Sequence, residues 1–465
     1  MFTNQSKFLW DNPTQMNYGL AITDVDGDGS FELFVAGFNG PNLVLKYNGQ
    51  GLVNIADEIL ADAGRQAIGV AAGDIDGDGR EEIYVLNTDT FAGRKQFGDF
   101  PRGTAPWGDR LFDYRDGKWV DLFSLPENQN LLNLSAGRSV VCVDRKGTGQ
   151  YGFFVANYGG PMRLYELNEK GHLVDVAPEV GLDLTTGGRS IISLPLVSDH
   201  MDIFAVNEHG RNFLFCNQGD GTFKEMAQMA GIDDPDQNGR GLVALDADGD
   251  GRFDLVYGNW LGPHRMYLQG VPGHFKDVAP PDMAIPSPIH TVISADFDND
   301  GYEELFFNNM GEPNRLFAYR AGTWKAIDTG EAWEPDGAGT GAAVGDLDED
   351  GQLTLFIAHG EATVQPLTLY SPPENGHAWL RVLPLTERGA PARGAIVTLI
   401  GEKQTQRRVI DAGSGYLCQM EPIAHFGLGE NPVIKQIEVR WPDGTTAKIS
   451  SPKANQLIRV PHPSA

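Results

Sequence analysis

The chain has 465 residues, of which 36 are basic and 63 acidic, giving a formal net charge of −27. This acidic excess argues against nucleic acid or an anionic membrane surface as the main partner and favours cations as ligands. Glycine (58 residues) and proline (28) are abundant while only 21% of residues are charged, which favours short strands joined by turns over helices or disorder. All-β is therefore the expected class.

The N-terminal segment MFTNQSKFLWDN has no basic stretch followed by an apolar run, and no stretch approaches the roughly 20 apolar residues that span a bilayer. As given, the sequence predicts a cytoplasmic protein without membrane insertion. A chain that had lost a secretion signal would look the same, which leaves an extracellular or periplasmic location open. Cys142, Cys216 and Cys418 are far apart and set among apolar neighbours, so we expect buried thiols rather than disulfides or a thiolate metal site.

An acidic stretch recurs along the chain. The copies are DVDGDGSFE at Asp24, DIDGDGREE at Asp74, DADGDGRFD at Asp246, DFDNDGYEE at Asp296 and DLDEDGQLT at Asp346. Three of the four intervals are 50 residues and the fourth is 172 residues, which leaves room for two degenerate copies. One of these retains Asp144 at its first position, and the other retains only the trailing Asp202. The sequence thus predicts seven repeats.

Each repeat has the pattern of four short strands. One apolar run precedes the acidic loop and a second follows it, a third resembles RLYEL, and a Gly-bearing turn leads to a fourth such as GTFKEMA. Four strands in about 50 residues form the blade of a β-propeller. We therefore expect a seven-bladed β-propeller over residues 1–373. Residues near Lys7 to Trp10 are expected to complete the last blade by pairing near Leu367 to Tyr370.

The loops have the pattern D-x-D-x-D-G-x-x-[DE]. It places side-chain oxygens at positions 1, 3, 5 and 9 and a backbone carbonyl at position 7, which suits calcium, a cation that takes six to eight oxygens. Zinc would require His or Cys, and magnesium needs fewer carboxylates. An EF-hand is excluded because strands follow the loops and position 12 is Val35 or Val85 rather than Glu. The alternative is a set of solvated acidic turns, but clustered carboxylates repel one another unless a cation neutralises them.

We accordingly predict up to five Ca²⁺ ions with a structural role. Ser30 and its counterparts at position 7 would contribute their carbonyl oxygens, and the seventh loop should bind most weakly because position 9 is Thr354. The predicted ligands are Asp24, Asp26, Asp28, Ser30 and Glu32; Asp74, Asp76, Asp78, Arg80 and Glu82; Asp246, Asp248, Asp250, Arg252 and Asp254; Asp296, Asp298, Asp300, Tyr302 and Glu304; and Asp346, Asp348, Asp350 and Gln352.

Residues 374–465 contain short alternating runs separated by Gly, Pro and Asp turns, which predicts a small β-sandwich-like domain. Within it, Arg408, Ser414, Tyr416 and His425 could suggest acid–base chemistry. There are no paired carboxylates and no nucleophile elbow around Ser414, so a structural role for the Gly-Ser-Gly turn is favoured.

Two sets of motifs resemble known families. The repeats, and NQGDGTFKEMAQMAGI in particular, resemble the FG-GAP or VCBS repeats of integrin α-subunit propellers. GAIVTLIGEKQTQRRVIDAGSGYLCQMEPIAHFGLGE and IEVRWPDGT resemble the ASPIC/UnbV domain, which follows such repeats in the cartilage acidic protein family and its bacterial relatives. The resemblance implies a calcium-binding extracellular or surface interaction protein with no established enzyme chemistry. The sequence as given shows neither the secretion signal nor the cysteine-rich modules of the animal members, which leaves location and partner open.

A second candidate site lies six residues before the first acid of each loop. A strand of that length crosses a blade, so these positions should ring the mouth of the central channel on the face opposite the loops. Arg138, Arg189, Arg240 and His290 fall there on consecutive blades and could bind an anion such as a carboxylate, a sulfate or an acidic glycan. In the alternative interpretation these side chains pair with acids of adjacent loops, such as Glu208 or Asp236. The insertion Thr88 to Gly108 could overhang the same face.

The sequence as a whole predicts a calcium-binding interaction or adhesion scaffold. Its partner would be a protein or an acidic glycan, and we expect a monomer that binds neither nucleic acid nor membrane. The alternative is a carbohydrate-active lyase or hydrolase that uses the basic mouth, because propellers host such chemistry there. A lyase would need a base, for which His209, His264 and His290 are the candidates.

Overall fold

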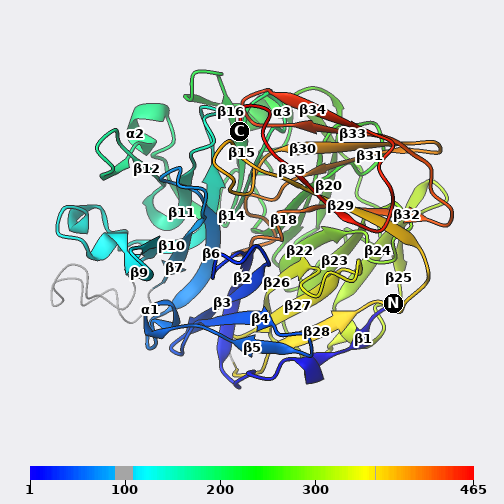
Figure 1. Ribbon diagram of the computed structural model, residues 1–465, viewed down its shortest axis with the longest axis horizontal. Helices are drawn as coiled ribbons and strands as arrows, with labels where there is room; N and C mark the ends of the chain where they lie inside the picture. Colours follow the sequence, from blue (N-terminus) through cyan, green and yellow to red (C-terminus); the bar gives the residue numbers. More distant parts are fainter. Residues whose placement is uncertain (89–107, 362) are drawn as a thin grey trace.

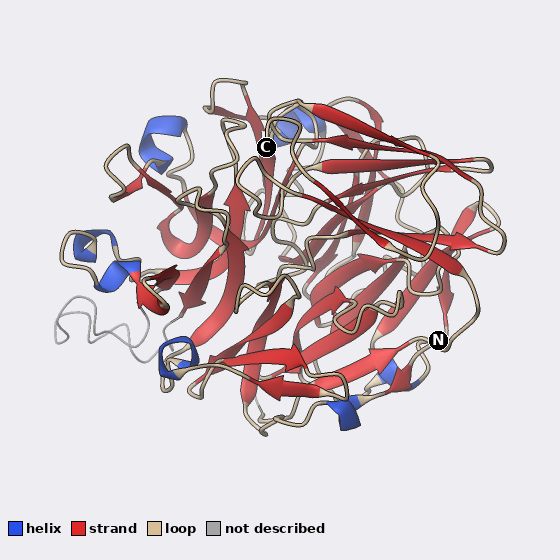
Figure 2. Ribbon diagram, in the orientation of Figure 1, coloured by secondary structure: helices blue, strands red, loops and turns tan. Residues whose placement is uncertain are grey.

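The computed structural model describes residues 1–88, 108–361 and 363–465. The predicted insertion Thr88 to Gly108 therefore lies almost wholly outside the described residues. Strands dominate the structure, and its few helices are single turns at the periphery (Figure 2). The α-helices are α1 (Glu58–Ala61), α2 (Ala177–Val180) and α3 (Ala227–Ala230). The expected all-β class is confirmed.

The strands of the larger part form consecutive four-stranded antiparallel units. In chain order they are β2 (Met16–Thr23), β3 (Glu32–Phe38), β4 (Leu43–Tyr47) and β5 (Leu52–Asn54); β6 (Ala67–Gly73), β7 (Glu82–Asn87), β8 (Arg110–Arg115) and β9 (Lys118–Asp121); β10 (Ala136–Val143), β11 (Gly152–Pro161), β12 (Arg163–Leu167) and β13 (Leu173–Asp175); β14 (Thr185–Leu194), β15 (Asp202–Asn207), β16 (Phe213–Asn217) and β17 (Phe223–Glu225); β18 (Gly239–Leu245), β19 (Asp254–Asn259), β20 (Arg265–Val271) and β21 (His274–Asp277); β22 (Ile289–Ala295), β23 (Glu304–Asn309), β24 (Arg315–Arg320) and β25 (Thr323–Ile327); and β26 (Gly339–Gly345), β27 (Thr354–His359), β28 (Thr368–Ser371) and β1 (Thr3–Asn4).

The first strands of the units close a ring. β2 contacts β6, and the contacts continue through β10, β14, β18 and β22 to β26, which returns to β2. This is the arrangement of a β-propeller. The third and fourth units are also joined through a β11–β14 pairing, so they form one eight-stranded sheet.

The strand sequences account for the packing. Second strands such as β7 (EIYVLN) are buried along their whole length, and a nearly continuous apolar run is what a strand buried on both faces requires. First strands such as β6 (AIGVAAG) are rich in small residues because they crowd around the axis. A Cβ atom at Gly19 of β2 would lie only 2.2 Å from the carbonyl oxygen of Leu417.

The N-terminus completes the last unit, but with a different segment from the one predicted. β1 pairs with β28, with Thr3 opposite Ser371 and Asn4 opposite Tyr370 (Figure 1, blue beside yellow). The prediction that residues near Lys7 to Trp10 supply this strand is wrong, because Ser6–Phe8 form a 3-10 turn. Thr3 and Asn4 form the strand because the preceding residue, Phe2, is buried against Phe297, with ring centroids 4.8 Å apart.

Residues from Ala378 onward form a second module of two sheets, ordered β32-β29-β35 and β31-β30-β33-β34. Apolar side chains between the sheets, including Leu380, Val397, Phe426 and Trp441, form one core, as expected for a β-sandwich. In Figure 1 the module, orange to red, lies across one face of the ring. The predicted domain boundary at residue 373 stays a prediction. The strands are β29 (Ala378–Pro384), β30 (Ile396–Gly401), β31 (Thr405–Val409), β32 (Ala424–Gly429), β33 (Ile434–Arg440), β34 (Thr446–Ser450) and β35 (Leu457–Val460).

Between β31 and β32 the chain leaves the sandwich and enters the centre of the ring. We call residues 411–421 the channel segment. Its backbone bonds directly to first strands: Gly415 N donates to Leu242 O (2.8 Å), Gln419 N donates to Leu20 O (2.8 Å), and Leu417 O accepts from Val70 N (3.2 Å). The Gln419 side chain also bonds both backbone groups of Ala72, at 2.7 and 2.9 Å. The channel segment thus fills the axis that the sequence predicted as a channel.

Candidate calcium loops and channel mouth

The carboxylate at position 1 shapes each acidic loop. Asp24 accepts from Gly27 N (2.7 Å) and Gly29 N (2.9 Å), and Asp74 accepts from the equivalent amides of Gly77 (2.6 Å) and Gly79 (3.0 Å). Position 6 is left-handed in every loop, with φ of +90° at Gly29 and +96° at Gly79, which explains its glycine. In the degenerate third loop Asp144 also accepts from position 6, Gly149 N (2.7 Å), but its second bond comes from Thr148 N at position 5 (2.9 Å). Position 1 and the glycine at position 6 thus form a turn without the other acids.

The acid at position 9 closes the loop from the other side. Glu32 Oε2 accepts from Val25 N (2.7 Å), and Glu82 Oε2 accepts from Ile75 N (2.6 Å). Both side chains are buried. Burial raises the pKa of Glu32 to about 7 although the amide bond from Val25 lowers it, and nearby Asp26 raises it further. The loops therefore carry their negative charge at an energetic cost unless a cation is present.

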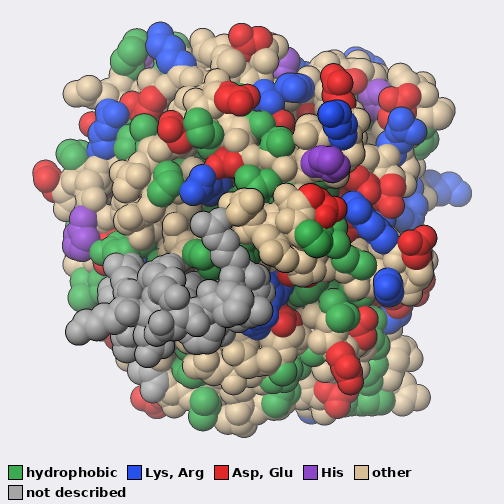
Figure 3. Space-filling model, turned by 90° about the vertical axis from the view of Figure 1, so that its left-hand side faces the viewer, with side chains coloured by type: hydrophobic (Ala, Val, Ile, Leu, Met, Phe, Trp, Pro, Cys, Tyr) green, Lys and Arg blue, Asp and Glu red, His purple; other side chains and the backbone are tan. Residues whose placement is uncertain are grey.

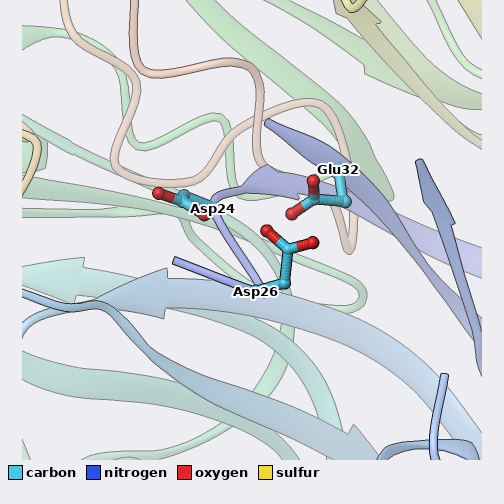
Figure 4. A group of neighbouring side chains, drawn as sticks. All are labelled: Asp24, Asp26 and Glu32. Atoms are coloured by element: carbon cyan, nitrogen blue, oxygen red, sulfur yellow. The ribbon is translucent and has the colours of Figure 1, made fainter. Parts of the chain in front are cut away.

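The predicted acidic ligands come together within single loops. One oxygen each of Asp24, Asp26 and Glu32 lie within 4.8 Å of one another, and the same holds for three acids each in the second, fifth and sixth loops. In Figure 4 Asp26 and Glu32 turn their carboxylates toward each other with Asp24 beside them. At position 7 the amides donate to the position-5 carboxylates; the residues are Ser30, Arg80, Arg252, Tyr302 and Gln352. These acidic clusters could hold metal ions.

Two loops enclose a cationic side chain. Lys46 Nζ lies 2.6 Å from Asp28 Oδ2 and 3.3 Å from Glu32 Oε1, and also contacts Asp26. In the sixth loop the Arg320 guanidinium contacts Asp298 (2.7 Å), Asp300 (3.0 Å) and Glu304 (2.9 Å). These groups lie against the oxygens that a divalent ion would bind.

The C-terminal module covers the loop face. Arg459 Nη2 donates to Gly29 O of the first loop (2.6 Å), Gly427 N donates to Asp296 Oδ2 of the sixth (3.1 Å), and Arg381 Nη1 lies 3.1 Å from Asp346 Oδ2 of the seventh. Asp296 and Asp346 at position 1 thus lie between propeller and module, whereas acids at positions 3 and 5, such as Asp26 and Asp28, are exposed. On the face shown in Figure 3, by contrast, acidic, basic and apolar side chains are interspersed.

The channel mouth holds Tyr416 of the channel segment. Arg189 Nη1 lies 3.4 Å from the Tyr416 hydroxyl, and the rings of His290 and Tyr416 meet edge to face with centroids 5.7 Å apart. Burial acts to raise the pKa of Tyr416, but Arg189, Arg138 and Arg240 together hold it below its ordinary value.

Two of the predicted basic residues pair as the alternative interpretation expected. Arg189 and Arg240 both contact Glu208, the latter at 3.4 Å. Arg138 Nη1 donates to Thr88 Oγ1 (2.7 Å). Burial, and then neighbouring Arg189, lowers the pKa of Arg240 to about 10.

Comparison with known proteins gives the chain its family. The model of the FG-GAP-like repeat matches residues 24–85, 198–257, 246–307 and 296–357, and the model named ASPIC and UnbV matches residues 386–465. The chain is 48% identical over 494 residues to Cartilage acidic protein 1 of Xenopus tropicalis, covering 97% of this chain and 74% of the relative. Identity to the Homo sapiens protein of the same name is 47%, with 97% and 73% covered.

The chain belongs to the cartilage acidic protein family. The predicted resemblance is confirmed, and the names of these relatives denote no catalytic activity. Among solved structures, one titled BBS1N in complex with ARL6DN shares 14% identity at a TM-score of 0.48 over 78% of this chain and 96% of the other, too low to carry an argument. Within the described part of the chain, no helix is long and apolar enough to cross a membrane.

Two of the three candidate histidines are poorly suited to act as the base that a lyase would require. His264 is buried between Asn259 N (3.0 Å) and Ser287 Oγ (3.0 Å). Burial lowers the pKa of both His264 and His290 to about 3, so neither readily accepts a proton near neutral pH. His209 has a largely exposed side chain, 3.8 Å from Glu208.

Sequence reasoning missed the residues that reach the loops from outside the repeat motif. Lys46, Asp113 and Arg320 come from third strands, and Arg381 comes from the C-terminal module. Tyr416 was considered only for acid–base chemistry, and its place at the channel mouth was missed. The third-strand residues have a sequence signal, because each is a charge near the end of a short apolar run. The residues of the C-terminal module have no such sequence signal, because only the tertiary fold brings them to the acidic loops and the channel mouth.

Proposed function

We propose that this member of the cartilage acidic protein family is an extracellular interaction scaffold whose propeller is stabilised by up to five calcium ions. One observation carries the proposal: backbone amides hold the carboxylates at positions 1 and 9, and acid oxygens within the loops lie within 4.8 Å of one another. Such oxygen-only, acid-rich sets suit Ca²⁺. The scaffold would be a monomer that binds a protein or an acidic glycan.

The location of the loops supports a structural rather than a catalytic role for the ions. Glu32 and Glu82 are buried, and the module contacts the loops through Arg459 and Gly427. Ions bound there would lie against buried acids of the propeller and next to the module. Since the unfolded chain offers no such site, their binding would add directly to the stability of the fold.

Thermal unfolding of the full chain in millimolar Ca²⁺ and in EGTA tests this proposal. A site filled at 100 times its dissociation constant adds about 2.7 kcal/mol, so several sites should raise the unfolding temperature by many degrees. Magnesium at the same concentration is the control and should substitute poorly, because it retains its waters. Equal unfolding temperatures in calcium and in chelator would refute the proposal.

The channel mouth supports an anionic ligand as a second proposal. Arg189 and Arg240 share Glu208, so among these three groups positive charge exceeds negative charge in a largely buried setting. A carboxylate or sulfate, free or on an acidic glycan, would balance it. Binding of sulfated oligosaccharides should be lost in a variant carrying Arg189→Ala and Arg240→Ala, and retained in Arg388→Ala, an exposed arginine of the module. Equal binding by both variants would exclude the site.

A further inference from the structure

In the first two blades the third strand places one charged residue directly beside the acidic loop. The pairs Leu33 with Leu45 and Ile83 with Phe112 place Lys46 across from Glu32 in the first blade and Asp113 across from Glu82 in the second. The two blades thus carry opposite charges in the same structural slot, next to the acid at position 9.

In the second blade this slot adds a carboxylate to the cluster. Asp76, Glu82 and Asp113 each place an oxygen within 4.8 Å of the others. Asp113 is 1% exposed, and its Oδ1 has no hydrogen-bond partner among the described residues. Its Oδ2 accepts from Arg115 Nε, and the Arg115 side chain is 40% exposed. A buried carboxylate oxygen without a partner, beside two further acids, is an arrangement that a bound cation would stabilise.

In the first and sixth blades a basic side chain of the third strand supplies a cation to the loop. Lys46 lies directly across from Glu32, whereas Arg320 lies at the end of β24, two residues beyond Ala318, the residue across from Glu304. Lys46 and Arg320 each contact three acids of their loop, at positions 3, 5 and 9. Calcium could use those oxygens only if the ammonium or guanidinium group moved away, and the site would keep an extra positive charge nearby. Both effects lower affinity for a divalent ion.

We propose that residues of the third strand set the relative calcium affinities of the loops. Asp113 is an additional ligand that gives the second loop the highest affinity. Lys46 and Arg320 are built-in counter-ions that lower the calcium affinity of the first and sixth loops. The proposal rests on the proposed function that the loops bind calcium. It also means that Lys46 stabilises the first loop in chelator, whereas the stability of the second loop depends more strongly on calcium.

Calorimetric titration of Ca²⁺ into the full chain tests this order of affinities. Asp113→Asn keeps the shape of the side chain and should weaken the tightest class of site by at least about tenfold. Asp116→Asn is the matched control: it removes one charge from the same hairpin, is exposed, and has φ of +52°, which Asn tolerates. It should leave the tight class unchanged.

Lys46→Met gives an independent test in the opposite direction. It removes the tethered charge and should raise the number of tight sites by one. Hydrogen exchange in EGTA should then show the first loop losing protection in Lys46→Met but not in wild type. If wild type binds calcium while Asp113→Asn matches Asp116→Asn and Lys46→Met gains no tight site, the order of affinities is wrong and the proposed function stands. If wild type releases or takes up no heat and chelator leaves its stability unchanged, the proposed function itself fails, and the order of affinities with it.

Discussion

Arg393 should be among the most costly residues to replace in this chain. It is fully buried, and all five of its N–H groups have acceptors. Nε and Nη2 bind the two carboxylate oxygens of Glu81, at 2.6 and 3.0 Å. The remaining N–H groups donate to the carbonyls of Asp411 (2.8 Å), Met420 (3.1 Å) and Ile22 (3.1 Å). One side chain thus joins the second acidic loop, the channel segment and the innermost strand β2.

Arg393→Met removes the charge and all five bonds while keeping much of the apolar volume. Breaking a buried ion pair by removing one partner costs about 3–5 kcal/mol, because the other charge stays buried and unpaired. Here Glu81 would keep only the Thr23 hydroxyl, at 2.8 Å, as a partner among these contacts. Arg393→Lys should recover little, since an ammonium group cannot reproduce a five-donor fork.

Urea unfolding followed by tryptophan fluorescence, in calcium, measures the effect. Arg388→Met serves as control because Arg388 is exposed, and surface changes cost at most about 0.5 kcal/mol. A double variant carrying Glu81→Met and Arg393→Met should regain most of the loss, since both charges are gone. A loss below about 1 kcal/mol in Arg393→Met, or a double variant as unstable as the single one, would refute the reasoning.

Two further predictions concern other buried groups. Phe2→Ala should cost about 3–5 kcal/mol in urea unfolding, whereas Phe8→Ala, at a side chain 42% exposed, should cost much less; equal losses would contradict the closure by β1. Burial raises the pKa of Asp109 from 3.8 to about 7, so the folded chain binds this proton more tightly than the unfolded chain, and wild type should lose stability relative to Asp109→Asn as the pH rises from about 4 to 7. Urea unfolding at a series of pH values checks the sign, and a gap that stays constant across this range would disprove it.

The repeats and the loops could be predicted because their signals are local and periodic. The acids at alternate positions and the glycine at position 6 are consequences of one turn, and that turn recurs about every 50 residues in most of the chain. Lys46 and Asp113 were also within reach, since strand alternation and the short third strand place them beside position 9. An alignment of the third strands shows that the first blade has a basic residue, Lys46, where the second has an acidic one, Asp113.

The channel segment could not be predicted by the same route. Its hydrogen bonds join Gly415 and Gln419 to first strands more than 150 residues earlier in the chain, and a short run of mixed composition gives no pattern for such pairing. The prediction of the strand that closes the ring was wrong for a related reason. KFLW has the stronger apolar pattern, but Phe2 is the aromatic residue that reaches the core, and only packing decides between them.

The number of ions bound need not equal the number of acidic loops. Within the described residues, Lys46 lies in the first loop, Arg252 pairs with Asp250 in the fifth, Arg320 lies in the sixth, and Arg381 reaches Asp346 in the seventh. In the second loop Arg115 pairs with Asp113 and Arg80 donates to Val25 O, and no ion pair joins the four predicted acids to another described residue. Since each cation within a loop reduces the charge that calcium would neutralise, the same five sequence motifs should fill over a wide range of calcium concentration, with the second loop first.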